Sequence, residues 1–221
     1  MSPAELAALW LTLKLSLVVT LLLLILCAPL AWWLSRTQSR FKPSIEALVA
    51  LPIILPPTVL GFYLLIAFAP DGFLGRISGG SLAFSFEGLV FGSLIYSLPF
   101  VVQPLQASFS RVDQVSLEAA TMMGANPWDR FISVVLPMSI PGIISAAVMG
   151  FAHTVGEFGV VLMIGGSIPD ETRVLSIAIF EAVELLDYES AHRLSLGLVI
   201  FSFLLLLLVY TRGHKFRITQ L

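Results

Sequence analysis

The chain has 221 residues, of which 57% are hydrophobic and only 12% are charged, and its formal net charge is −2. A soluble domain of this size carries about 25% charged residues, so this composition indicates an integral membrane protein. The weak net charge argues against nucleic acid as a partner, and the single Cys27 excludes a disulfide framework and a thiol metal site.

The first predicted membrane span covers residues 15–34, an uncharged run long enough for a helix to cross the hydrocarbon core of a bilayer. Trp32 and Trp33 stand at its far end, where indole rings favour the interface between lipid and water. The residues before the run carry no positively charged segment, and the run is too long for a signal peptide. We therefore expect this span to be retained in the mature protein.

The second uncharged run covers residues 47–70 and contains Pro56-Pro57-Thr58 in its interior. Because proline lacks an N–H and clashes with the preceding helical turn, we expect this helix to be kinked or locally broken. A broken membrane helix is tolerated where its backbone faces protein or a water-filled cavity. Pro56, Pro57 and Thr58 are therefore pathway candidates, and plain helix kinking is the alternative interpretation.

Two further spans are predicted in the middle of the chain. A glycine- and serine-rich loop at 71–87 precedes a third span at 88–110, which we expect to be interrupted at Pro99 and Pro104. The fourth span begins at residue 131 or 136 and runs to about residue 166. Within it, small residues recur four apart on one helix face, which favours close packing against another helix: Gly142, Ala146 and Gly150.

The segment from 166 to 191 has a different character. Its acidic residues around Asp170 suit the first turn of a helix, and apolar residues follow them with helical periodicity. The apolar part is too short to cross a bilayer, so we expect a re-entrant or interfacial helix over about 170–187. A fifth span is predicted at 194–211, followed by a basic tail.

The distribution of Lys and Arg predicts the orientation of these spans. The side that is richer in Lys and Arg is cytoplasmic by the positive-inside rule. The chain is thus predicted to cross the membrane five times, with its N-terminus outside, its C-terminus in the cytoplasm and the short helix on the outer side. Eight residues lie on the predicted cytoplasmic side (Arg36, Arg40, Lys42, Arg111, Arg130, Arg212, Lys215 and Arg217), and three lie on the other (Arg76, Arg173 and Arg193).

His153 and Glu157 are ionisable residues inside the fourth predicted span. Because they are four positions apart, they share a helix face and are within reach of a hydrogen bond. Ionisable residues within a membrane are costly and commonly functional. Three interpretations stay open for them: a structural pair, a role in a pathway or gate, and a proton relay.

The sequence lacks the motifs of nucleotide hydrolysis and of the commonest hydrolases. It contains no G-x₄-G-K-[ST], no H-E-x-x-H and no G-x-S-x-G. We therefore expect a protein that is not an enzyme and that takes its energy from a partner or from an ion gradient. No cofactor and no metal site are predicted.

The longest polar interlude, residues 111–135, lies between the third and fourth spans. A short helix is predicted because Glu118, Ala119, Ala120 and Met122 are good helix formers, and Gly124 supplies the turn that ends it. Leu136-Pro137 marks the return to apolar sequence, with proline in the first turn of the next helix. The interlude is either a docking element or an ordinary amphipathic loop helix.

The pattern E-A-A-x₃-G-x₉-[VI]-x-L-P resembles the cytoplasmic coupling loop of permease subunits of ABC importers, and it is formed here by Glu118, Ala119, Ala120, Gly124, Val134, Leu136 and Pro137. Two more stretches resemble the molybdate and sulfate branch of that family: Gly156-Glu157-Phe158-Gly159 and Ile168-Pro169-Asp170-Glu171-Thr172. Ser167 stands where that branch usually has Asn. The stretches 51–63 and 180–188, and the compact length, resemble molybdate permeases in particular.

This resemblance implies an all-α integral membrane protein with the type I ABC importer permease fold, in a single domain over 1–221 whose coupling loop spans about 111–135. It implies an ATP-driven importer for molybdate in a bacterial or archaeal inner membrane, with sulfate or tungstate as alternatives. The implied partners are membrane lipid, two ATPase subunits and an extracytoplasmic oxyanion-binding protein. The implied coupling residues are Leu117, Glu118, Ala119, Ala120, Met123, Gly124, Ala125, Leu136 and Pro137, and the pathway or gate candidates are Pro56, Pro57, Thr58, His153, Gly156, Glu157 and Gly159.

A homodimer is expected, because the chain has one coupling pattern and too few spans to enclose a pathway alone. A different permease as the second half is the alternative. A secondary transporter that uses His153 and Glu157 is another class, although the sequence lacks the internal repeat that such transporters normally carry. A membrane scaffold without transport is disfavoured by the broken helices and glycine-rich spans.

Overall fold

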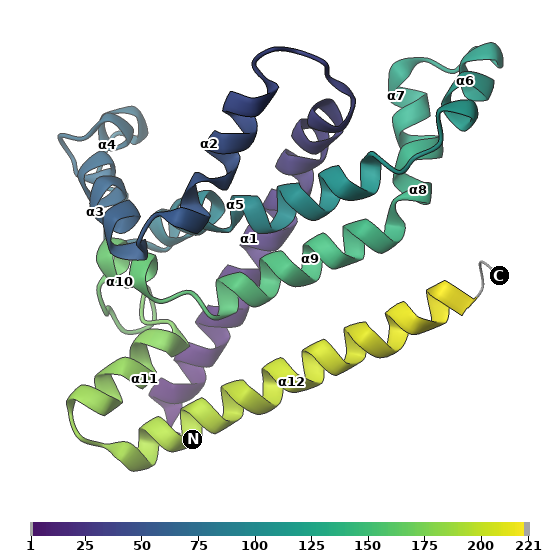
Figure 1. Cartoon of the computed structure of the whole chain (residues 1–221). Helices are drawn as coiled ribbons and strands as arrows, with labels where there is room; N and C mark the ends of the chain where they lie inside the picture. The colour runs from purple at the N-terminus through teal and green to yellow at the C-terminus, as the bar shows by residue number, and fades with distance from the viewer. Residues whose placement is uncertain (1, 219–221) are drawn as a thin grey trace.

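The computed structural model describes the backbone of residues 2–218 and the side chains of residues 2–207, and its regular structure is helical (Figure 1). Among the described residues, three helices are long and apolar enough to cross a membrane alone, and up to five spans result when two bent helix pairs are each counted as one. The predicted all-α membrane architecture is confirmed in this form. The elements are α1 (Pro3–Arg36), α2 (Lys42–Ile54), α3 (Pro57–Phe68), α4 (Phe73–Ser78), α5 (Phe86–Phe109), α6 (Gln114–Met122), α7 (Pro127–Arg130), the π-helical turn η1 (Phe131–Val135), α8 (Leu136–Met138), α9 (Ile140–Val155), α10 (Gly159–Gly165), α11 (Leu175–Glu184) and α12 (Tyr188–Ile218).

The first span is longer than predicted, because α1 begins at Pro3. Ser2 and Glu5 form a capping box: the Ser2 Oγ accepts a hydrogen bond from the Glu5 N–H (3.2 Å), and the Glu5 carboxylate accepts one from the Ser2 N–H (2.7 Å). A buried face of α1 packs against α5 and α9, and at 1.5 Å per residue the helix is about 51 Å long. Polar residues on this face donate to carbonyls four residues earlier: Thr12, Ser16 and Thr20.

The second span is broken where the sequence predicts a break. α2 ends at Ile54, α3 begins at Pro57, and the two helices differ in direction by 108°. Leu55 and Pro56 between them have extended ψ angles, as residues that precede proline prefer. Pro57 then occupies the first turn of α3, where its missing N–H removes no hydrogen bond.

The third span is not interrupted, so the prediction from Pro99 and Pro104 is wrong. α5 starts at the Ser85 cap, whose Oγ accepts a hydrogen bond from the Gly88 N–H (3.1 Å), and it continues through both prolines. α5 packs against α1, α2 and α9, and this packing holds the helix although each proline removes one backbone hydrogen bond.

The close contact between α5 and α9 rests on the predicted face of small residues. A Cβ on Gly142 would lie 2.2 Å from Ser108, and a Cβ on Gly150 would lie 2.6 Å from a methyl group of Val101. Ala146, between the two glycines, is fully buried. The predicted role of this face in close helix packing is confirmed.

The fourth span differs from the prediction at both ends. The segment from α7 to α8 is continuous, but α9 departs from it after Ser139 with a bend of 76°. α9 then ends at Val155 with Gly156 as its cap, instead of continuing to near residue 166, and the backbone is non-helical at Phe158 (φ −131°, ψ −60°) before α10 begins. α10 is a separate short helix that packs against α3 and α5.

Two loops differ from the sequence interpretation. The glycine-rich loop contains the short helix α4, which the sequence does not predict. The acidic segment around Asp170 does not begin a helix, because the Thr172 Oγ1 donates to the Gly165 carbonyl (2.7 Å) and accepts from the Ile168 N–H (3.0 Å), which closes a loop there. The predicted short helix exists as α11, but it begins at Leu175.

The last span also begins earlier than predicted, since α12 starts at Tyr188. Arg193 in its second turn makes ion pairs with Glu189 (2.7 Å) and with Glu5 of α1 (3.2 Å). The side chains of the predicted basic tail, namely Arg212, His214, Lys215 and Arg217, lie outside the described residues.

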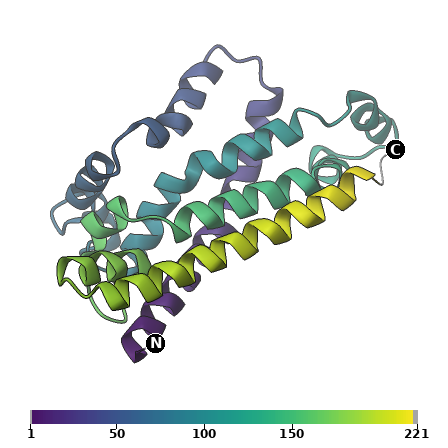
Figure 2. The ribbon, with the colours of Figure 1, turned by 60° about the horizontal axis from the view of Figure 1, so that its bottom comes forward.

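The long helices extend between two opposite ends of the molecule (Figures 1 and 2). At one end the α1–α2 loop meets the α5–α6 turn, where Arg36 donates hydrogen bonds to the Phe109 and Val112 carbonyls. The C-terminal part of α12 points toward this end, where α6, α7 and α8 lie. At the opposite end the N-terminal half of α1 holds α11, because the Thr12 Oγ1 accepts a hydrogen bond from the Leu175 N–H (2.7 Å).

Candidate functional site

α6 is the centre of the predicted coupling loop. Asp113 caps it, because its carboxylate accepts a hydrogen bond from the Val115 N–H (3.3 Å). Leu117 anchors the helix to the rest of the protein with only 8% of its surface exposed. Glu118 and Ala119 of the pattern are exposed, and Ala120 is half-buried.

Gly124 ends α6 in the left-handed conformation, with φ = +86°. Its N–H donates to the Thr121 carbonyl (3.0 Å), and the Ala125 N–H donates to the Ala120 carbonyl (3.0 Å). These two hydrogen bonds form a Schellman motif, which pairs carbonyls at the end of the helix. A Cβ at Gly124 would have no neighbour within 4 Å, so glycine is favoured by the backbone and not by crowding.

α7 is braced against α6 after this turn. The Asn126 Oδ1 caps α7 by accepting hydrogen bonds from the Trp128 and Asp129 N–H groups, both at 2.9 Å. The Arg130 guanidinium donates to the Thr121 Oγ1 (2.8 Å), which joins the two helices. The two helices of the loop are therefore held together, and the residues that cap them belong to the loop itself.

Four exposed apolar side chains on α6 and the residues that follow it form what we call the docking surface: Val115 (68% exposed), Met122 (89%), Met123 (88%) and Trp128 (66%). Exposed apolar groups that gather in one place mark interaction sites, and methionine adapts readily to a partner. The coupling residues that the resemblance implies include Met123 but not the other three. Large apolar residues within a polar interlude are the signal that would have identified them.

The remaining coupling residues lie beyond η1. Leu136 and Pro137 begin α8, where Leu136 is half-buried and Pro137 is exposed. The structure thus brings Leu117 to Ala125 together on one helix and its cap, whereas Leu136 and Pro137 direct the chain back toward the membrane helices.

Two of the pathway candidates, Pro57 and Gly159, meet at the break between α2 and α3. A Cβ on Gly159 would lie 2.7 Å from the Pro57 Cβ, so the start of α10 touches the start of α3. Pro56 and Thr58 are exposed beside this contact, and Gly156 is exposed at the end of α9. The structure therefore places candidates from two distant stretches of sequence at one junction.

His153 and Glu157 do not form the predicted pair. The His153 Nδ1 lies 2.9 Å from the Ser97 Oγ of α5, and its ring stacks on Phe100 with the centroids 3.8 Å apart. Glu157 follows the end of α9, so it does not continue the helix face of His153, and no ion pair joins the two in the described part of the chain. The Glu157 side chain is buried, with 3% of its surface exposed.

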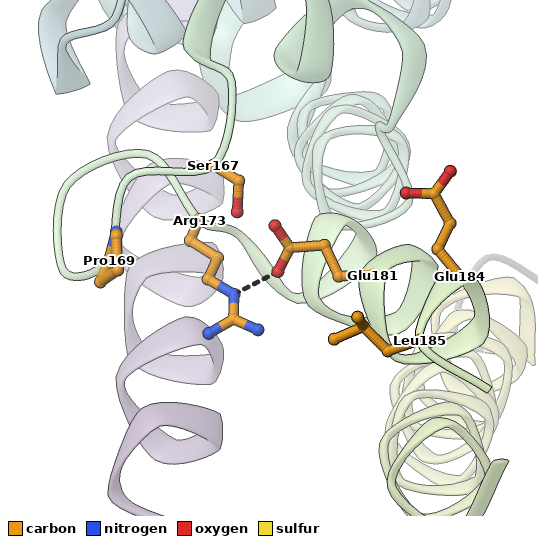
Figure 3. Close-up of a pocket in the computed structure, with 6 residues that line it drawn as sticks. All are labelled: Ser167, Pro169, Arg173, Glu181, Glu184 and Leu185. Carbon is orange, nitrogen blue, oxygen red and sulfur yellow. Dashed lines mark ion pairs between the residues drawn. The ribbon is translucent and has the colours of Figure 1, made fainter. Parts of the chain in front are cut away.

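A pocket of about 400 Å³ opens beside α11 (Figure 3), at the end of the molecule opposite α6. The Arg173 Nε lies 2.7 Å from the Glu181 Oε2 within it. Two carboxylates and one guanidinium line the pocket, so its charge does not favour a dianion, and we do not assign it to an anion pathway. The lining residues are Ser167, Pro169, Arg173, Glu181, Glu184 and Leu185.

Known proteins resemble this chain along most of its length. Residues 22–212 match the family described as "Binding-protein-dependent transport system inner membrane component". The chain is 54% identical over 215 residues to the molybdenum transport system permease protein ModB of Azotobacter vinelandii, which covers 96% of this chain and 95% of that protein. It is 32% identical over 183 residues to the probable sulfate transport system permease protein cysT of Zygnema circumcarinatum, which covers 81% of this chain and 64% of that protein.

A solved structure supports the fold independently. A chain of a bacterial ABC transporter involved in the import of the acidic polysaccharide alginate aligns with a TM-score of 0.78 and 17% sequence identity, and the alignment covers 97% of this chain and 80% of that chain. At this identity the likeness concerns the fold alone. It agrees with the permease fold that the sequence implies.

Proposed function

Because the chain belongs to the family of binding-protein-dependent transport system inner membrane components, we propose that it is the permease subunit of an ATP-driven molybdate importer. The observation that carries this proposal is the likeness to the molybdenum transport permease of Azotobacter vinelandii, which extends over nearly the whole of both chains. The likeness to a sulfate permease is weaker and covers less of that protein, so sulfate is the alternative substrate, together with tungstate.

The geometry of α6 supports coupling to a partner ATPase. The helix is held by the Asp113 cap, the Leu117 anchor and the Gly124 turn, yet its docking surface is uncovered. A helix that docks into another protein needs both properties, because it must keep its shape while it offers apolar area for burial. The permease itself supplies no nucleotide-binding motif, so ATP hydrolysis would need a separate ATPase subunit. That ATPase would bind at the docking surface.

The orientation that we propose places α6 in the cytoplasm. Arg36, Arg111 and Arg130 all belong to the segments that meet at this end, in agreement with the positive-inside rule. The opposite end, with α11 and the start of α12, then faces the extracytoplasmic binding protein that delivers the oxyanion.

We further propose that two copies of the chain form the membrane part, with two ATPases and one binding protein. Only 11% of the membrane-crossing window of α12 is buried within the chain, which leaves surface for lipid and for a second copy. The shared pathway would run near the junction of Pro57 and Gly159, where the broken second span meets α10.

Reconstitution into proteoliposomes with the co-purifying ATPase and binding protein tests this function. We expect uptake of labelled molybdate that requires ATP and the binding protein and that unlabelled molybdate suppresses more strongly than sulfate does. Uptake without the ATPase would refute the ABC mechanism, and stronger suppression by sulfate would refute the substrate. The mass of the intact complex decides the assembly: two copies of this chain support it, and one copy beside a different permease contradicts it.

A further inference from the structure

The last residue of α1, Arg36, reaches across to the turn between α5 and α6. Its Nη2 donates to the carbonyls of Val112 (2.7 Å) and Phe109 (3.3 Å), and its Nη1 donates to the Gln114 Oε1 (3.5 Å). The last carbonyls of a helix lack a full set of N–H partners, and a positive charge is favoured beside them. Arg36 therefore acts as a C-terminal cap for α5 that is supplied by another helix.

Aromatic rings continue this contact toward the end of the coupling loop. The Arg36 guanidinium lies over the indole of Trp32, 4.9 Å from the ring centroid. Trp32 in turn contacts Phe109 of α5 and Phe131 of η1, with ring centroids 6.0 Å apart in each case. Phe109 and Phe131 also touch each other at 6.0 Å. Rings from α1, α5 and η1 thus form one cluster beneath the guanidinium.

The two connections of α6 to the membrane helices therefore both converge on α1. The entry to α6 is held by the hydrogen bonds of Arg36, and the exit passes through η1, which the aromatic cluster holds. The Asp113 and Gly124 caps belong to the loop itself, so α6 does not depend on Arg36 for its helical structure.

We propose that Arg36 is a positioning residue for energy coupling, which fixes the direction of α6 relative to α1 so that a displacement of α6 moves α1. This inference rests on the proposed function of the chain as an ABC permease. α1 carries the displacement to the opposite end, where Thr12 binds the start of α11 and Glu5 binds Arg193 of α12. Without Arg36, α6 still docks to the ATPase, but the α5–α6 turn deforms when α6 moves, and α1 does not follow.

Variants at Arg36 test this proposal in proteoliposomes that contain the chain, its ATPase and its binding protein. We expect Arg36→Gln to lower the molybdate taken up per ATP hydrolysed by about fivefold or more while ATP hydrolysis continues, since Gln cannot reach both carbonyls with a charged donor. Arg36→Lys gives an intermediate ratio, because a single ammonium lacks the guanidinium fork. Arg40→Gln is the matched control: it removes the same charge four residues further along the chain, in the α1–α2 loop, where Arg40 lies over the exposed Phe41 ring.

Hydrogen exchange provides a second readout that does not require transport. In the detergent-solubilised full chain, the backbone amides of residues 110–112 in the α5–α6 turn should exchange about tenfold faster in Arg36→Gln than in Arg40→Gln. If the wild-type chain takes up no molybdate, the proposed function fails, and exchange still decides whether Arg36 holds the turn. The inference is overturned if Arg36→Gln keeps the coupling ratio of Arg40→Gln or the same protection of these amides.

Discussion

Substitution of Gly124 tests whether the left-handed turn after α6 orients the docking surface. Gly124 has φ = +86°, and a Cβ added there would meet no atom within 4 Å, so the whole cost of a side chain falls on the backbone. That cost is about 1–2 kcal/mol for an ordinary L-residue, larger for a β-branched one and small for Asn, which tolerates this region. Since about 1.4 kcal/mol is a tenfold change in an equilibrium, the cost is enough to populate an opened turn.

The molybdate taken up per ATP hydrolysed should therefore be highest in the wild type and in Gly124→Asn, lower in Gly124→Ala and lowest in Gly124→Val. An opened turn loses the Gly124 to Thr121 and Ala125 to Ala120 hydrogen bonds, which moves Met123 and Trp128 relative to each other. The assay measures molybdate uptake and ATP hydrolysis together in proteoliposomes. Gly124→Val should remain in the membrane and lose most uptake per ATP hydrolysed.

Two results would refute this reasoning. If Gly124→Val couples as well as Gly124→Asn, the positive φ angle is not needed. If Gly124→Asn fails as completely as Gly124→Val, the requirement is for the absence of a side chain at the partner surface and not for backbone conformation.

Three other expectations follow from residues elsewhere in the chain. Glu157→Gln keeps the shape of a side chain that we take to brace the junction after α9, so it should retain most transport; complete loss with intact assembly would favour a gate or proton role. Cysteine at Gln38 should be shielded from impermeant thiol reagents in intact cells and cysteine at Ser78 should be labelled, whereas the reverse pattern would contradict the proposed orientation. Gly142→Val forces Ser108 away from α9 and should destabilise the chain by about 1–3 kcal/mol in thermal unfolding. Gly197→Ala, whose added Cβ would meet no atom within 4 Å, is the control. Equal melting temperatures of the two variants would contradict the packing argument.

Features that depend on the chemistry of a residue and its immediate neighbours could be predicted from the sequence. The break before Pro57 follows from the restricted conformation of residues that precede proline. The turn at Gly124 follows from the freedom of glycine at positive φ. The short helices α6 and α11 follow from local composition, although the start of α11 does not.

Features that depend on distant segments could not be predicted in this way. Pro99 and Pro104 do not break α5, because α1, α2 and α9 pack around it. The start of α11 is displaced because Thr172 bonds back to Gly165, which closes a loop where acidic residues favour a helix. Helical spacing puts His153 and a carboxylate on one face only if the helix continues, and α9 ends before it. The role of Arg36 is likewise invisible in the sequence, since its acceptors lie more than seventy residues away.

Because α1 is fixed at both ends, the number of residues between those ends has a geometric meaning. Thr12 and Arg36 are about 36 Å apart along the helix at 1.5 Å per residue. One inserted residue would turn Arg36 by about 100° around the helix axis, away from the Val112 carbonyl. An insertion of seven residues would nearly restore the angle but would lengthen the helix by about 10 Å. Angle and length cannot both be kept, so the number of residues in α1 between Thr12 and Arg36 is constrained, whereas its exposed side chains are free to vary.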